Sequence, residues 1–302
     1  MEKKIGFECK VFGDKEVVVN LSQICNSLCL NCPNDDEFRQ TVISPEETEN
    51  FIKSNVKSNT ERVVFIGGEP TISKNLIPSI ILAKKLNKNV VIQINSNGRM
   101  FYYDKFAEQI SKFNGDKLDL HIALYGSNEK VHDKITQIEG SFKQTTQGIK
   151  NLIKLNTKIS IRNIVSKQNY TDLEDYGAYI ANEFRNYKDN IIRVVLVGMD
   201  IIGNAWKNRE LLAVSHLDVA PHIENCTDVL ASNGFNPEIH LLPKGIFKKE
   251  YQKFAIMSGC VGGDFVDSYG CNVCVYKGYC SRLLNSYNKI FGNKEHHPIY
   301  RK

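Results

Sequence analysis

Short apolar segments alternate with helical segments along the first two thirds of this 302-residue chain. Six of the apolar segments are rich in Val and Ile and predict strands, and stretches with helical periodicity separate them. This alternation is typical of parallel βαβ units, in which helices cover both faces of a sheet. We expect strands at 17–21, 62–66, 89–94, 118–125, 158–165 and 191–197, and helices at 45–56, 75–86, 104–113, 142–155 and 173–187.

The length of this alternating region limits the barrel that it can form. An eight-unit (β/α) barrel normally needs about 250 residues, whereas only about 180 residues separate Val17 from Val197. We therefore predict an α/β protein with a partial (β/α)6 TIM-like barrel. In such folds, ligands bind at the carboxyl ends of the strands.

Residues outside the barrel are expected to form smaller units at both ends of the chain. The apolar Phe7 and Val11, followed by the turn-forming Gly13–Asp14, predict an accessory strand or hairpin. The predicted units are the accessory strand at 1–15, the barrel at 16–200, a bridging helix (216–232) and strand (235–243) within 201–245, and a small cysteine-rich C-terminal extension at 246–302.

Composition is that of a globular protein with a sizeable core, with 42% hydrophobic and 24% charged residues. The 39 basic and 34 acidic residues leave a formal charge of +5, and the basic residues are scattered. Because a nucleic-acid-binding surface needs clustered Lys and Arg, no nucleic-acid partner is expected. The N-terminus lacks an apolar h-region and no run is long enough to span a bilayer, so we expect a cytoplasmic protein without membrane contact.

Seven of the nine cysteines fall into two tight groups. In a reducing compartment such grouping favours metal binding over disulfides. Cys9 and Cys226 stand alone and are expected to be small buried hydrophobes or inert thiols.

The first group, Cys25, Cys29 and Cys32, has the spacing C-x-x-x-C-x-x-C and directly follows the first predicted strand. Three thiolates so close together can hold three irons of a 4Fe-4S cube, which leaves the fourth iron without a protein ligand. A zinc site is the alternative, since zinc also binds thiolates at C-x-x-C spacing. A disulfide agrees less well with a reducing compartment.

The second predicted strand ends in Gly67-Gly68-Glu69-Pro70. Two glycines there allow a ligand to approach the backbone, and the carboxylate and carbonyls can accept hydrogen bonds from an ammonium group. A simple turn is the alternative. Because the other strands end at the same rim, we expect the cysteine loop and this segment to meet Asn95-Ser96-Asn97, Tyr125-Gly126 and Gly198-Met199.

The cysteine loop and the Gly-Gly-Glu-Pro segment resemble, over residues 16–200, the radical S-adenosylmethionine (SAM) superfamily. The resemblance implies that SAM binds the fourth iron, and that a reduced cluster cleaves it to a 5'-deoxyadenosyl radical that abstracts hydrogen from carbon. An electron donor such as flavodoxin or ferredoxin is then implied. The family usually has an aromatic residue near the adenine where this chain has Asn31. The implied cofactor contacts are Asn31, Gly67, Gly68, Glu69, Pro70, Asn95, Ser96, Asn97, Tyr125, Arg162, Gly198 and Met199.

Two polar features within the barrel allow more than one interpretation. Arg162 lies in an apolar strand, where a buried guanidinium needs an anion. That anion is either the cofactor's carboxylate, as the resemblance implies, or the partner in a structural salt bridge. His132-Asp133 indicates either acid–base chemistry or a hydrogen-bonded turn in the loop before a helix.

The second cysteine group is Cys260, Cys271, Cys274 and Cys280, with spacing C-x(10)-C-x-x-C-x(5)-C. Taken alone, these residues predict either zinc or an iron-sulfur centre. They resemble the auxiliary-cluster extensions of peptide-modifying radical SAM enzymes, which implies one auxiliary 4Fe-4S cluster. Together with Leu-Tyr-Gly, Val-Gly-Met and Gly-Asn-Ala, they are most similar to maturases of His-Xaa-Ser peptide systems.

The resemblance implies an enzyme that acts on a ribosomally made precursor peptide and produces a crosslink, an epimer or another carbon-centred change. The cofactor would supply the difficult chemistry, so no side chain need act as an acid or base. Two alternatives stay open. One is a radical SAM enzyme acting on a nucleotide or other small molecule, and the other is a non-catalytic zinc or iron-sulfur binding protein.

Overall fold

The computed structural model describes residues 10–12, 15–114, 117–257 and 263–300. Within these residues, eight strands form one sheet in chain order, with β2 to β8 parallel and β1 antiparallel to β2. The strands of this sheet are β1 (Lys10–Phe12), β2 (Glu16–Asn20), β3 (Arg62–Ile66), β4 (Val91–Ser96), β5 (Leu118–Ala123), β6 (Ile159–Val165), β7 (Ile191–Gly198) and β8 (Pro237–His240).

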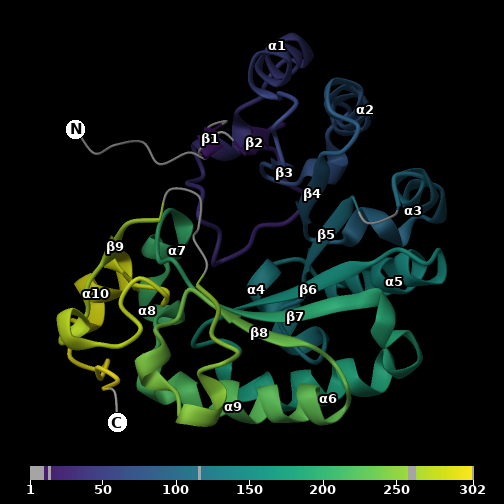
Figure 1. Ribbon diagram of the computed structural model, residues 1–302. Coiled ribbons are helices and arrows are strands. Elements are labelled where there is room, and N and C mark those ends of the chain that lie inside the picture. Colours follow the sequence, from purple (N-terminus) through teal and green to yellow (C-terminus); the bar gives the residue numbers. More distant parts are fainter. Residues whose placement is uncertain (1–9, 13–14, 115–116, 258–262, 301–302) are drawn as a thin grey trace.

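Helices lie along the outer side of the arc that the strands form, and the C-terminal segment lies next to α7 and α8 (Figure 1). This segment adds the two-stranded antiparallel pair β9 (Phe265–Val266) and β10 (Leu283–Leu284). The α-helices are α1 (Pro45–Asn55), α2 (Leu76–Leu86), α3 (Asp104–Ser111), α4 (Glu129–Thr136), α5 (Ser141–Lys154), α6 (Leu173–Glu183), α7 (Asn204–Lys207), α8 (Arg209–Leu212), α9 (His216–Ser232) and α10 (Asn285–Phe291).

The predicted partial TIM-like barrel is confirmed, and all six expected strands are present as β2 to β7. A seventh parallel strand, β8, pairs with β7 and comes from the segment expected to bridge barrel and extension. The accessory strand is present as β1, while Phe7 and Gly13–Asp14 lie outside the described residues. The predicted unit boundaries stay a prediction.

Helix ends follow local sequence signals closely. Ser44 caps α1 by accepting a hydrogen bond from the Glu47 N–H, while the Glu47 carboxylate accepts from the Ser44 N–H. Helix α6 ends at Glu183, earlier than expected, and a 3-10 segment at Arg185–Asn190 follows it.

Side chains alternate between the outer and inner faces of the sheet. On β5, Leu118, Leu120 and Ile122 are buried in the main apolar core. Asp119 and His121 alternate with them and therefore belong to the inner face. The interior of the barrel thus carries polar groups, whereas the outer face packs on helices.

The segment around His132-Asp133 is helix α4 rather than the expected loop. His132 is buried, and its Nδ1 accepts a hydrogen bond from the Tyr125 N–H at 3.0 Å. The Asp133 carboxylate accepts hydrogen bonds from Gly140 N at 2.6 Å, Phe142 N at 2.7 Å and Ser141 Oγ at 2.7 Å. The expected local turn is therefore wrong: the Asp133 hydrogen bonds join α4 to the start of α5, and the His132 hydrogen bond joins α4 to the segment after β5.

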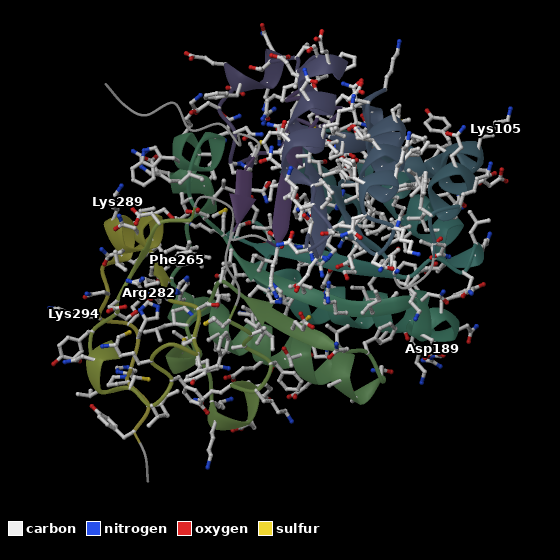
Figure 2. All side chains as sticks on the ribbon, turned by 45° about the horizontal axis from the view of Figure 1, so that its top comes forward. Lys105, Asp189, Phe265, Arg282, Lys289 and Lys294 are labelled. Atoms are coloured by element: carbon white, nitrogen blue, oxygen red, sulfur yellow. The ribbon has the colours of Figure 1, made fainter. Side chains whose placement is uncertain are left out.

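The C-terminal extension packs against the inner face of β7. Leu283 and Leu284 are buried in one apolar cluster with Val195, Val197 and Leu241. Figure 2 shows Phe265 of β9 on the same extension, and its side chain packs against this cluster. The extension therefore covers part of the inner face of the sheet. No helix in the described ranges is both long and apolar enough to cross a membrane.

We expect Asp133→Ala to lower the free energy of unfolding by on the order of 2 kcal/mol, because two backbone N–H groups at the start of α5 lose their acceptor. Urea denaturation followed by circular dichroism measures this change. Glu139→Ala removes a nearby exposed carboxylate and is the control. Equal stability of the two variants would contradict the capping role.

Candidate functional site

A cavity of about 520 Å³ opens at the carboxyl ends of the barrel strands. Cys25, Cys29 and Cys32 line it together with residues from the ends of β3 to β8. Its volume is within the range of about 300–1,000 Å³ that small-molecule and cofactor sites occupy. The expectation that separate motifs meet at one rim is thus confirmed by geometry.

The cavity brings together the predicted cofactor contacts, with the exception of Pro70. Pro70 is buried and begins a short 3-10 turn outside the lining. The predicted residues that line the cavity are Asn31, Gly67, Gly68, Glu69, Asn95, Ser96, Asn97, Tyr125, Arg162, Gly198 and Met199.

Backbone hydrogen bonds fix the cysteine loop on two sides. On the β3 side, Gly68 N donates to Ser22 O at 2.7 Å and Glu69 N donates to Ile24 O at 2.9 Å. On the α4 side, Leu28 N donates to Thr136 O at 3.0 Å. Leu30 N donates to Ile135 O at 2.9 Å. The loop therefore holds its shape through the protein's own backbone.

The two glycines after β3 are needed for a reason other than the one expected. A β-carbon at Gly67 would lie 2.1 Å from Ser22 O, and one at Gly68 would lie 2.3 Å from both Gln23 O and Ile24 O. These positions face the cysteine loop. The glycines thus allow the loop to approach β3 at these α-carbons, and because both also line the cavity, the expected approach of a ligand stays a prediction.

Glu69 is buried, and protein donors surround its carboxylate. Oε1 accepts from Thr71 N at 3.0 Å, Thr71 Oγ1 at 2.5 Å and Ser96 Oγ at 2.8 Å. Oε2 accepts from Asn97 N at 2.7 Å. Burial raises the pKa of Glu69, which these hydrogen bonds oppose. Since each carboxylate oxygen has two lone pairs, the expected ammonium contact has room only at Oε2.

Two arginines that the sequence reasoning missed contact the cysteine loop. Arg99 donates from Nη1 to Asn26 O and, at 3.2 Å, to Ser27 Oγ. Arg39 donates from Nη2 to Cys29 O at 3.2 Å. Neither residue lies in a motif, and the Arg99 contacts span more than seventy positions, so local pattern carries no signal for them.

The thiols fit a metal-bound state. Burial raises the pKa of Cys25 to about 11 and raises that of Cys29 further, and the positive charge of a bound metal would oppose this effect. Two buried donors in the cavity, Asn31 Nδ2 and Arg39 Nε, have no hydrogen-bond partner among the described residues. These donors and the three thiols suit a cluster and a polar cofactor.

A charged network occupies the inner face below the cavity. Asp119 Oδ2 accepts from Arg62 and Arg193, each at 2.9 Å, and Asp119 Oδ1 lies 2.9 Å from His121 Nε2. Burial alone would raise the pKa of Asp119, but the His121 hydrogen bond and the arginine charges hold it well below its usual range. Burial lowers the pKa of His121. The period-two pattern of β5, Leu-Asp-Leu-His-Ile, is the signal that would have placed these residues inward.

Three further residues that the sequence singled out are Arg162, Cys226 and Cys9. Arg162 on β6 is half-buried and lines the cavity, and both of its expected roles stay predictions. Cys226 is fully buried in the core, as expected of an inert thiol, and burial raises its pKa. Cys9 lies outside the described residues.

Three tail cysteines each accept a backbone N–H. Ser268 N donates to Cys271 Sγ at 3.2 Å, Ile299 N to Cys274 Sγ at 3.4 Å, and Lys244 N to Cys280 Sγ at 3.2 Å. Cys260 lies outside the described residues. Across the described part of the chain, no three His, Cys, Asp or Glu side chains are arranged to hold one metal ion. A cube distributes its thiolates over separate irons, so the choice between zinc and a cluster rests on metal analysis.

The barrel, the three-thiol loop and the shared cavity define a class of proteins that bind a cofactor at the barrel rim. Residues 19–180 match the Radical SAM superfamily. Because this match covers more than half of the chain, the protein belongs to that superfamily. The family uses a 4Fe-4S cluster and SAM.

The sequence relatives have varied activities. The chain is 29% identical over 166 residues to the Fe-coproporphyrin III synthase of Methanosarcina barkeri, covering 53% of this chain and 40% of that protein. It is 26% identical over 160 residues to the GTP 3',8-cyclase of Campylobacter jejuni subsp. doylei, covering 52% and 48%. The chain thus spans less than half the length of either relative.

The solved structures that resemble the fold include two enzymes crystallised with peptides. Streptococcus suis SuiB bound to its precursor peptide SuiA superposes with a TM-score of 0.59 at 16% identity, over 74% of this chain and 48% of SuiB. Native anSMEcpe with bound AdoMet and Kp18Cys peptide gives 0.57 at 15% identity, over 74% and 63%. At this identity, the likeness shows a shared fold.

We expect Gly68→Ala to reduce the iron that the protein retains after anaerobic reconstitution, because the added methyl group collides with Gln23 O and Ile24 O and displaces the cysteine loop. Iron content per chain is the measurement. Gly140→Ala is the control, since its β-carbon meets nothing within 4 Å and only backbone strain is added. Full iron content in Gly68→Ala would show that the loop does not depend on this contact.

Proposed function

We propose that this protein is a radical SAM enzyme that modifies a ribosomally made precursor peptide. The observation that carries the proposal is that all three thiols of the loop line the same cavity as the predicted cofactor contacts. When bound, the cluster and SAM supply hydrogen abstraction by a 5'-deoxyadenosyl radical. The product would be a crosslink, an epimer or another carbon-centred change.

The chain's own residues bind and orient the reactants. Cys25, Cys29 and Cys32 hold the cluster, while Glu69 keeps the β3 and β4 rims together through its hydrogen bonds. Asn31 Nδ2, which has no hydrogen-bond partner among the described residues, would donate to the cofactor where other members have an aromatic ring. An electron donor such as flavodoxin or ferredoxin would supply the reducing electron.

Two observations favour a peptide as the substrate. The solved structures similar in fold include SuiB and anSMEcpe, each with a bound peptide, and the cysteine-bearing extension packs against Val195 and Val197, which line the cavity. The finer resemblance to His-Xaa-Ser maturases stays a prediction. Anaerobic incubation with SAM and synthetic peptides encoded beside the gene, followed by mass spectrometry, tests the proposal, and dependence on the peptide's leader would support it.

A nucleotide or other small molecule is the second candidate substrate. The similarity to GTP 3',8-cyclase favours it. A small-molecule enzyme would turn over without any peptide leader, so the same incubations with GTP in place of peptide distinguish the two. A non-catalytic metal protein is the remaining alternative, and zinc at both sites without iron-sulfur absorption would establish it.

We expect Cys25→Ala, Cys29→Ala and Cys32→Ala each to abolish 5'-deoxyadenosine formation, because two thiolates under-ligate the cube. Chromatography of anaerobic reactions containing SAM and dithionite measures the product. Cys226→Ala, which removes a thiol from the core, should retain activity. Unchanged product in any of the three loop variants would refute the assignment.

We further propose that Cys260, Cys271, Cys274 and Cys280 bind one auxiliary 4Fe-4S cluster. The N–H donors to three of the sulfurs support it, because such hydrogen bonds stabilise thiolate ligands of clusters. The apolar contact of Leu283 and Leu284 with inner-face Val195 and Val197 places the extension next to the cavity. The cluster would accept the electron from a product radical in a net oxidation.

Reconstituted parent protein should hold about eight irons, and the Cys271→Ala/Cys274→Ala variant about four, since each cube contains four. Metal analysis by mass spectrometry gives both counts. Retention of all iron in the double variant, or one cube plus a zinc in the parent, would mean that the extension holds no auxiliary cluster.

A further inference from the structure

A fixed cation lies inside the cavity beside the cysteine loop. Arg39 lines the cavity together with Cys25, Cys29 and Cys32. Its side chain is only 15% exposed, and its Nη2 donates to Cys29 O at 3.2 Å. The guanidinium is therefore anchored to the loop that carries the thiols.

The protein leaves part of this guanidinium's hydrogen-bonding capacity unused. Arg39 Nε is buried without a hydrogen-bond partner among the described residues. The Asp36 carboxylate lies 3.6 Å from Nε, beyond hydrogen-bond distance, and is 67% exposed. The fixed position of this charge beside the thiols therefore rests on the Cys29 O contact and on the burial of the side chain.

We propose that Arg39 is a positioning residue for the iron-sulfur cluster, holding the loop at Cys29 and favouring the reduced cluster through its charge. The inference rests on the proposed function. Reduction adds one negative charge to the cube, and a nearby cation in a poorly hydrated cavity stabilises the more negative state. Arg39 therefore makes the midpoint potential of the cluster less negative.

A second cation of the same region provides the contrast. Lys207 Nζ lies 3.3 Å from Asp35 and 3.7 Å from Asp36, and its side chain is 52% exposed. It does not line the cavity. Asp36 lies close to both cations, but only Lys207 is half-exposed, so solvent screens its charge and its removal should leave the cluster unchanged.

The test compares Arg39→Gln, Arg39→Lys and Lys207→Gln with the full-length parent. Both Arg39 variants keep an N–H donor for Cys29 O, but only Lys keeps the charge. The readouts are iron content and the midpoint potential, measured by a redox titration that follows the electron paramagnetic resonance signal changed by added SAM. Arg39→Gln should shift the midpoint to a more negative value, while Arg39→Lys and Lys207→Gln stay near the parent. Iron loss in Arg39→Gln that Arg39→Lys prevents also supports the proposal.

Three results would overturn the inference. They are equal midpoints in Arg39→Gln and Arg39→Lys, equal iron loss in both, or a shift in Lys207→Gln as large as that in Arg39→Gln. A parent protein that binds no cube would instead refute the proposed function itself. A parent with the cube and an unshifted Arg39→Gln variant would refute only the role of Arg39.

Discussion

The buried carboxylate of Glu69 joins the parts from which the site is built. It accepts hydrogen bonds from Thr71, which follows β3, and from Ser96 and Asn97 at the end of β4. Asn97 continues the connection by donating to Asn26 Oδ1 at 2.7 Å inside the cysteine loop. Because this carboxylate is buried, loss of any of its hydrogen-bond donors would cost free energy. Each of these hydrogen bonds therefore stabilises the site. One side chain thereby fixes two strand ends and the loop relative to each other.

Most of the fold follows from local pattern. The barrel strands and most outer helices were predictable because their apolar periodicity and their caps, such as Ser44 of α1, are local signals. Helix α4 was not, since its polar His132 and Asp133 suggested a turn, whereas tertiary hydrogen bonds to Tyr125 and α5 stabilise the helix. The pairing of β8 with β7 was also missed, because a strand pattern does not specify its neighbour.

Some residues of the site could likewise be predicted from local pattern, and others could not. Motifs at strand ends were placed correctly because parallel strands direct their carboxyl ends to one rim. Gly68 has a structural reason that the sequence did not indicate, since a β-carbon there would collide with Gln23 O and Ile24 O of the loop, while its contact with a ligand stays a prediction. Arg99 could not be predicted, because its contacts join segments more than seventy positions apart, and Arg39, although only ten positions from Cys29, lies in no motif. The inward position of Asp119 and His121 could have been predicted from the alternation along β5.

The extension has a consequence for how this protein can vary. Leu283 and Leu284 share one apolar cluster with Val195 and Val197 of β7, so neither segment buries its side chains without the other. Changes of volume on one side require compensating changes on the other, as in any close-packed interior. Exchange of the extension between relatives would therefore leave a gap or a clash along β7 unless the facing side chains of β7 changed with it.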